Sequence, residues 1–151
     1  MEFINDLVAR LEQKHICLNG CSKAQLAELI AKTGNLPKAY LEFLSAMGNG
    51  TNGGYMGGDS CFMNEIYDLK QGAEQLLAEN ESENKLTDDD FVFWASQGCM
   101  FCFFRLSDGD NPPVYFYNES GADNFIKIAG SFVEFLSNRL ELNAELFTEK
   151  L

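Results

Sequence analysis

Two groups of thiol and imidazole side chains have spacings that can support metal or redox chemistry, and the first is a C-x-x-C pair. Cys99 and Cys102 have the spacing of a zinc knuckle or a redox dithiol. They lie inside an aromatic run that we expect to be a strand, where residues three apart point to opposite faces and cannot share one ion. Buried cysteines that pack as small hydrophobic side chains explain the pair better.

His15, Cys17 and Cys21 form the second group, near a turn between two expected helices. Three such ligands can hold zinc or form a thiolate–imidazole pair. His15 is the only histidine of the chain, and no candidate loop for an oxyanion hole accompanies it. We therefore expect no catalytic residues, no metal and no cofactor, and keep an enzyme built on His15 and Cys17 as a remote alternative.

Two loops resemble ligand-binding motifs but lack the flanking elements that those motifs need. Residues 48–53 match G-x-G-x-x-G, yet they follow a helix, whereas a dinucleotide fingerprint follows a strand and opens a helix. Asp108, Asp110 and Glu119 are spaced somewhat like calcium ligands, but Pro112 and Pro113 stand where a ligand and a glycine belong. We expect a structural loop and a hairpin turn.

Acidic side chains are densest between residues 79 and 90, which we expect to form a surface loop. Such a loop is either only solvated or a docking surface for a basic protein. Charge and expected exposure select the candidate partner-binding residues, which are Glu79, Glu81, Glu83, Asp88, Asp89, Asp90, Asp108 and Asp110.

Charge and composition narrow the class of protein. The chain has 151 residues, a net charge of −12 and 46% hydrophobic residues, which predicts one folded domain spanning residues 1–151. Such a charge repels nucleic acids and anionic membranes, so we expect neither as a partner. The apolar runs are too short to cross a bilayer, and five cysteines, an odd number, favour a reducing cytoplasm.

Helical periodicity predicts helices at both ends of the chain. Apolar residues recur on one face over residues 3–14, and Ser22 with Gln25 forms a capping box for a second helix that ends at Gly34. A third helix begins at Pro37 and ends at Gly48. Residues 66–77 are expected to combine a strand end with a helix, Ser131 caps a helix, and residues 142–151 can add a short one.

Strand signals occupy the middle of the chain. Residues 91–95 and 99–106 are aromatic runs joined by Gly98, which predicts a hairpin. Residues 99–104 are apolar on both alternating faces and are expected to form a central strand. Further strands are expected at 61–63, 114–117 and 125–128. The prediction is an α+β fold, with a central, mostly antiparallel sheet flanked by N-terminal and C-terminal helices.

Four segments, read together, resemble the SUKH superfamily of fungal cell-wall-synthesis regulators and bacterial immunity proteins. They are Leu36-Pro37 with Tyr40, Phe43-Leu44 and Asn49-Gly50; the hairpin around Gly98; Pro113-Val114-Tyr115; and Ala129-Gly130-Ser131-Phe132 with Phe135-Leu136. They span roughly residues 20 to 140. The chain departs from the expected pattern at Arg105, where an acidic residue is expected near the end of the central strand.

The resemblance implies a SUKH-like fold and a non-catalytic binding role. It points to a cytoplasmic immunity protein that binds and occludes a cognate toxin, often a basic nuclease. The alternative within the superfamily is a regulatory or scaffold interaction domain. The oligomeric state, the toxin and the interface are not fixed by the sequence.

Overall fold

The computed structural model describes residues 2–52, 55–56 and 58–142. Four α-helices precede a four-stranded antiparallel sheet and a fifth follows it, which confirms the predicted α+β class. The final helix expected at 142–151 falls beyond Leu142 and thus outside the described residues. The elements are α1 (Asn5–Gln13), α2 (Lys23–Thr33), α3 (Lys38–Met47), η1 (Ile66–Asp68), α4 (Leu69–Glu79), β1 (Asp90–Ser96), β2 (Met100–Arg105), η2 (Leu106–Asp108), β3 (Val114–Asn118), β4 (Ile126–Ala129) and α5 (Phe132–Leu142).

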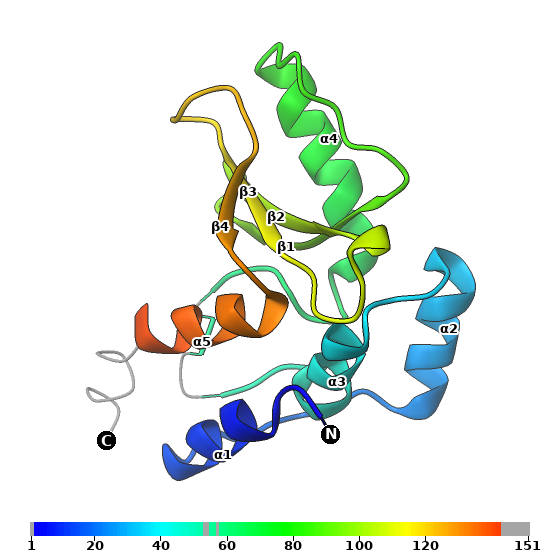
Figure 1. Cartoon of the computed structure of the whole chain (residues 1–151), viewed down its shortest axis with the longest axis vertical. Coiled ribbons are helices and arrows are strands. Elements are labelled where there is room, and N and C mark those ends of the chain that lie inside the picture. The colour runs from blue at the N-terminus through cyan, green and yellow to red at the C-terminus, as the bar shows by residue number, and fades with distance from the viewer. Residues whose placement is uncertain (1, 53–54, 57, 143–151) are drawn as a thin grey trace.

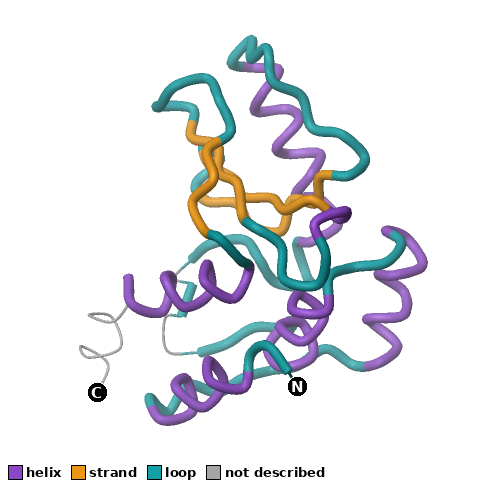
Figure 2. The backbone as a smooth tube through the Cα atoms, viewed as in Figure 1, coloured by secondary structure: helices purple, strands orange, loops and turns teal. Residues whose placement is uncertain are grey.

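The sheet has helices on both faces. Leu69, Ala73 and Leu76 of α4 line a groove together with Ala95 and Phe101 of the sheet, so α4 covers one face (Figure 1). α3 and α5 pack on the other face. The loop from α4 to β1 runs back along α4 (Figure 2). No helix in the described ranges has the length and apolarity needed to cross a membrane.

Local signals at the helix ends behave as the sequence predicts. The Ser22 hydroxyl accepts from the Gln25 N–H at 3.1 Å, and the Gln25 side chain accepts from the Ser22 N–H at 2.8 Å, so the capping box is confirmed. Gly34 ends α2 with a φ of 86°, a backbone conformation that favours glycine. Pro37 precedes the first residue of α3 instead of being that residue, a shift of one position.

The strands pair in the order β1-β2-β3-β4, so β2 is internal and its central residues 101–104 are buried, as predicted. Residues 97–99 separate β1 from β2, and Gln97 and Gly98 both have positive φ, which is typical of hairpin turns that fit the strand twist. Cys99 lies in this turn, outside β2, while Cys102 is buried opposite Trp94 and Phe116. Burial raises the pKa of the Cys102 thiol well above its ordinary value, because desolvation disfavours the thiolate.

Two local predictions are wrong. Residues 61–63 form no strand; next to them only Ser60 pairs with the sheet, through reciprocal hydrogen bonds of 2.8 and 2.9 Å with Ala95. The strand end expected before α4 is the 3₁₀ turn η1. Both segments are short apolar runs, whose periodicity does not distinguish a strand from a buried turn.

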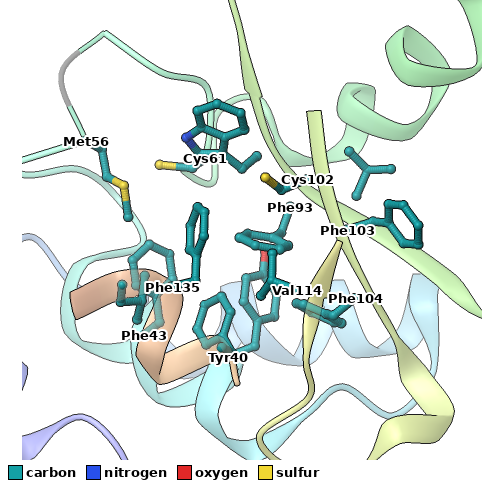
Figure 3. Close-up of a cluster of buried hydrophobic side chains, with 14 of the residues drawn as sticks. Tyr40, Phe43, Met56, Cys61, Phe93, Cys102, Phe103, Phe104, Val114 and Phe135 are labelled. Atoms are coloured by element: carbon teal, nitrogen blue, oxygen red, sulfur yellow. The ribbon is translucent and has the colours of Figure 1, made fainter. Parts of the chain in front are cut away.

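Tyr40 of α3 lies at the centre of the aromatic core between the helices and the sheet (Figure 3). Its ring lies 5.3 Å from Phe91, 5.2 Å from Phe104 and 5.5 Å from Phe132, centroid to centroid, in edge-to-face geometry. The side chain is fully buried, and its hydroxyl has no hydrogen-bond partner among the residues that the structure describes. Tyr40 therefore contributes its ring to the core, whereas its hydroxyl is desolvated without compensation.

Replacing Tyr40 with phenylalanine should therefore leave the free energy of unfolding unchanged or raise it by up to about 1 kcal/mol, because a buried unpaired hydroxyl is removed. Tyr55 is the matched control, since its buried hydroxyl donates to the Leu136 carbonyl at 3.0 Å. Tyr55→Phe should lower the free energy of unfolding by about 1 kcal/mol. Urea denaturation of both variants measures the two effects. Destabilisation by Tyr40→Phe comparable to that of Tyr55→Phe would mean that the Tyr40 hydroxyl has a partner.

Candidate partner-binding surface

The eight acidic candidates do not form one surface. Glu79, Glu81 and Glu83 lie at the far end of α4, and residues 88–90 return along α4 to the start of the sheet. Asp108 belongs to η2, and Asp110 lies beside the first turn of α3. The candidates thus lie in separate parts of the structure, and several of them make hydrogen bonds that stabilise the fold.

The end of α4 carries the most open group of acidic side chains. Glu79, Glu81 and Glu83 are exposed, and the β3–β4 loop adds Asp123 beside them. The Asp123 carboxylate accepts from the Ser82 hydroxyl at 2.5 Å and from the Glu83 N–H at 3.2 Å. The hydrogen bond from Ser82 is the main cause that lowers the pKa of Asp123. We call Glu79, Glu81, Glu83 and Asp123 the acidic end.

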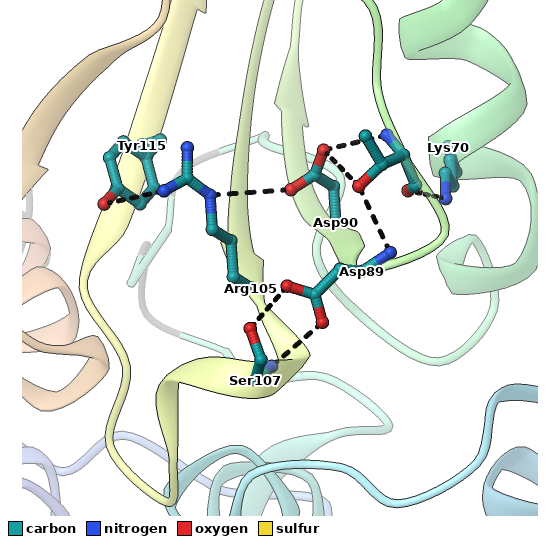
Figure 4. Close-up of polar contacts among 7 residues, drawn as sticks. Lys70, Asp89, Asp90, Arg105, Ser107 and Tyr115 are labelled. Carbon is teal, nitrogen blue, oxygen red and sulfur yellow. Dashed lines mark hydrogen bonds and ion pairs between the residues drawn. The ribbon is translucent and has the colours of Figure 1, made fainter.

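The expected exposure of Asp90 is wrong, because this residue is buried with only 7% of its surface exposed. Its carboxylate accepts from the Thr87 N–H at 2.8 Å and lies 3.8 Å from the Arg105 guanidinium (Figure 4). A solvated carboxylate would remain exposed to water, whereas the Asp90 carboxylate accepts from Thr87 and stabilises the loop before β1. Asp90 therefore does not have the exposure on which its choice as a docking residue rested.

Asp89 and Asp88 are also constrained by their surroundings. The Asp89 carboxylate accepts from the Ser107 N–H at 3.0 Å and from its hydroxyl at 2.6 Å, which ties the loop before β1 to η2 (Figure 4). Asp88 lines a groove of about 320 Å³ that Lys32 and Lys70 also line. Charge in this groove is balanced, so it offers no strongly anionic site.

Arg105, at the end of β2, fixes the same corner of the sheet. Its guanidinium lies over the Tyr115 ring at 4.4 Å and donates to the Tyr115 hydroxyl at 3.4 Å. With the ion pair to Asp90, it links β2 to the first residue of β1 and to β3. The departure from the expected acidic residue is thus accommodated by a local cation–π and ionic contact.

The turn between β2 and β3 caps two helices, a role that the sequence did not reveal. The N–H of Lys38 donates to the Asp110 carboxylate at 3.3 Å, and the N–H of Ala39 donates to the Asp110 carbonyl at 2.9 Å. The N–H of Val133 donates to the Asn111 side chain at 3.1 Å. These bonds satisfy free N–H groups in the first turns of α3 and α5. Asp108 and Asp110 are both exposed, but the Asp110 carboxylate also accepts a hydrogen bond in this cap.

The thiol and imidazole candidates do not converge on a metal. Within the part of the chain that the structure describes, no three His, Cys, Asp or Glu side chains lie close enough to hold an ion. His15 and Cys17 are exposed, and the Cys21 sulfur lies 3.7 Å from the Asn49 side-chain oxygen. Burial raises the pKa of Cys21, which disfavours its thiolate.

The sequence does not reveal two acidic side chains that are bonded across the fold, one of them buried and the other partly buried. Glu42 of α3 is 8% exposed and accepts hydrogen bonds from the backbone of the N-terminal segment. Asp59 accepts from the Arg139 guanidinium at 2.5 Å and from the Trp94 indole at 3.1 Å. Their partners lie 35 to 80 residues away along the chain, so no local pattern in the sequence marks them.

The segment around Asn49 joins the entry of α2 to the exit of α3. The Asn49 and Gln25 side-chain amides exchange two hydrogen bonds of 2.9 and 3.0 Å, and Asn49 also donates to the Gly20 carbonyl.

The family model for the SMI1 / KNR4 family (SUKH-1) matches residues 20–138, well over half of the chain. The chain belongs to this family. No curated protein matches the sequence.

The SUKH-1 signature of this chain consists of structural residues. Tyr40, Phe43 and Leu44 are core side chains, and Asn49 makes the side-chain hydrogen bonds with Gln25. The matched region includes α2 to α4, the whole sheet and α5 as far as residue 138, but not α1. These residues stabilise the fold, so candidate partner-binding residues are sought on the surface outside the signature.

Proposed function

We propose that this SUKH-1 protein is a cytoplasmic immunity protein that binds a basic toxin and occludes it without chemical catalysis. The observation that carries the proposal is family membership, because the superfamily includes immunity proteins. A net charge of −12 supports it, since an anionic surface attracts a cationic partner and accelerates encounter.

The acidic end is the surface we assign to this encounter. Its four carboxylates are exposed, project from the far end of α4 and the adjoining β3–β4 loop, and are held together by the Ser82–Asp123 contact. Asp89, Asp90 and Asp110 are excluded from the test, because replacing them would disturb the fold. Asp88 and Asp108 remain exposed candidates at a separate place.

Charge reversal of Glu79, Glu81 and Glu83 to lysine should slow association with the toxin about tenfold at low salt and change dissociation little. The difference should shrink as salt screens exposed charges beyond roughly 10 Å at 0.1 M. Stopped-flow or surface-based kinetics with an inactivated toxin domain, sought among the genes beside this one, measures both rates. The control reverses Asp6, Glu12 and Glu28 of α1 and α2, which changes the net charge equally.

Equal slowing in both triple variants would mean that only net charge matters and that the acidic end has no special role. The second candidate function is a regulatory or scaffold interaction domain, which the same family also supports. Failure of the unaltered protein to bind or neutralise any toxin encoded in its genome would overturn the immunity proposal in favour of that role.

A further inference from the structure

β4 forms one edge of the sheet and leaves apolar side chains open. Ile126 is 49% exposed and Ile128 is 41% exposed. Ile126 pairs with Phe116, which pairs with Cys102, so this row points to the same face of the sheet as Trp94. Lys127, the only charged residue of β4, alternates with the two isoleucines and points to the opposite face. The strand therefore presents an apolar row on the α5 side.

A groove of about 330 Å³ adjoins this row, between the sheet and α5. Ile128 and Phe116 line it from the sheet, with Trp94 beside them, and Phe135 and Leu142 line it from α5. Leu142 is 69% exposed. The edge strand and the groove together make one apolar surface. Edge strands are normally protected by charges, prolines, bulges or a covering element; β4 has Lys127 and a register shift beside Ile128, yet Ile126 and Ile128 stay exposed.

The cation beside the groove is already neutralised. Arg139 bonds Asp59 and lies 5.2 Å from the Trp94 ring, while Trp94 also donates to Asp59. Arg139 is paired with Asp59, and the other residues that line the groove are apolar apart from Asn138. An occupant must supply hydrophobic side chains, and backbone groups to pair with the outer edge of β4, which pairs with no other strand of the described residues.

We propose that an extended apolar segment of the basic partner adds to β4 as a fifth strand and places its side chains in the groove. Strand addition gives affinity through main-chain hydrogen bonds and specificity through pockets for alternate side chains. This inference rests on the proposed function and deepens it. The acidic end accelerates the encounter with the partner, whereas β4 and the groove hold the partner once it is bound.

Charge complementarity selects the basic partner over a second copy of this chain. Two copies joined at β4 would each carry a net charge of −12 and repel each other. A cationic partner is attracted by the same field and can cover the apolar edge. An immunity protein must also stay soluble before its toxin arrives, and mutual repulsion of the free chains serves that purpose.

The test compares binding of the inactivated toxin domain to the parent and to the double variant Ile126→Thr, Ile128→Thr. Threonine keeps the strand preference and removes apolar contact. The Kd should rise at least tenfold, mainly through faster dissociation. Tyr67→Thr is the control, because Tyr67 is 43% exposed but lines the separate groove between α2 and the sheet. Hydrogen exchange should show new protection of the 126–129 amides in the complex.

Each outcome decides between the claims. If the toxin binds parent and double variant equally, or the β4 amides gain no protection, strand addition is wrong and the proposed function stands. If the parent binds no toxin, the proposed function fails and this inference fails with it. Sedimentation of the free parent provides a further arm: self-association that the double variant abolishes would make a second copy the occupant and overturn the choice of partner.

Discussion

Replacing Glu42 with glutamine is expected to lower the free energy of unfolding by about 2–3 kcal/mol, because hydrogen bonds to a buried charged group are stronger than neutral ones. One carboxylate oxygen of Glu42 accepts the N–H groups of Glu2 at 2.9 Å, Phe3 at 2.8 Å and Ile4 at 3.4 Å. These N–H groups belong to the segment that precedes α1, so Glu42 of α3 anchors that segment to the fold. A glutamine has one neutral acceptor and two surplus donors in the same buried place.

The same substitution should reduce the loss of stability in acid. Desolvation raises the pKa of Glu42, but hydrogen bonds from Phe3, Glu2 and Ile4 outweigh it, and the pKa lies below its ordinary value. A carboxyl with a lowered folded pKa contributes stability that is full above the unfolded pKa and is lost as pH falls through the folded pKa. Stability of the parent should therefore fall below about pH 4.5 more steeply than that of Glu42→Gln.

Chemical denaturation between pH 3 and pH 7 measures both effects. Glu12→Gln is the control, because Glu12 is an exposed glutamate on α1. It should change the free energy of unfolding by less than about 0.5 kcal/mol. Parallel pH profiles for the parent and Glu42→Gln would contradict the assigned role of this carboxylate.

Replacing Gly20 with alanine is expected to cost about 3 kcal/mol or more, the second large effect. A Cβ at Gly20 would overlap the backbone carbonyl oxygen of Ser45 and lie 3.0 Å from its carbonyl carbon. Neither atom belongs to a flexible side chain, so α3 or the 19–21 segment must move. Movement would strain the adjacent bonds, in which the Cys21 N–H donates to the Leu44 carbonyl at 2.9 Å and Asn49 donates to Gly20 at 3.0 Å.

Gly72→Ala is the matched control and should have the opposite sign. Gly72 lies inside α4, and a Cβ there meets nothing within 4 Å. Alanine should raise the free energy of unfolding by about 0.5–1 kcal/mol, since glycine costs conformational entropy in a helix. Thermal and urea unfolding of the two variants checks this pair of predictions. A neutral Gly20→Ala would mean that the packing of the 19–21 segment against α3 adjusts freely.

Sequence patterns predicted the elements whose determinants are local. The capping box at Ser22 and Gln25 and the positive-φ turn at Gly98 are complete within a few residues. The buried strand β2 is marked by an unbroken apolar run, because both of its faces are covered. Residues 61–63 misled the prediction, since a three-residue apolar run carries no usable period.

The candidate surface was predicted less well, because exposure depends on contacts between distant residues. Asp90 and Asp110 look like solvated loop carboxylates in the sequence, yet one is buried beside Arg105 and the other caps a helix that begins 72 residues earlier. Glu42 was not predicted at all, because its hydrogen-bond partners in the N-terminal segment lie across the fold. The Glu79, Glu81 and Glu83 group kept its expected exposure, because the chain reverses there and little covers it.

The turn that caps α3 and α5 has a practical consequence for protein engineering. Residues 109–113 contain glycine, aspartate, asparagine and two prolines, the composition usually chosen for inserting a tag or opening the chain for circular permutation. Here an insertion would separate Asp110 from Lys38 or Asn111 from Val133 and release two helix ends at once. The tip of the loop after α4 also looks open, but Ser82 and Asn84 are bonded to Asp123. Reporter fusions or split-protein designs that must keep both helix caps should therefore use the exposed 119–122 stretch of the β3–β4 loop, whose N–H groups bond Cys99 and Asn118 and which directly precedes Asp123 of the acidic end.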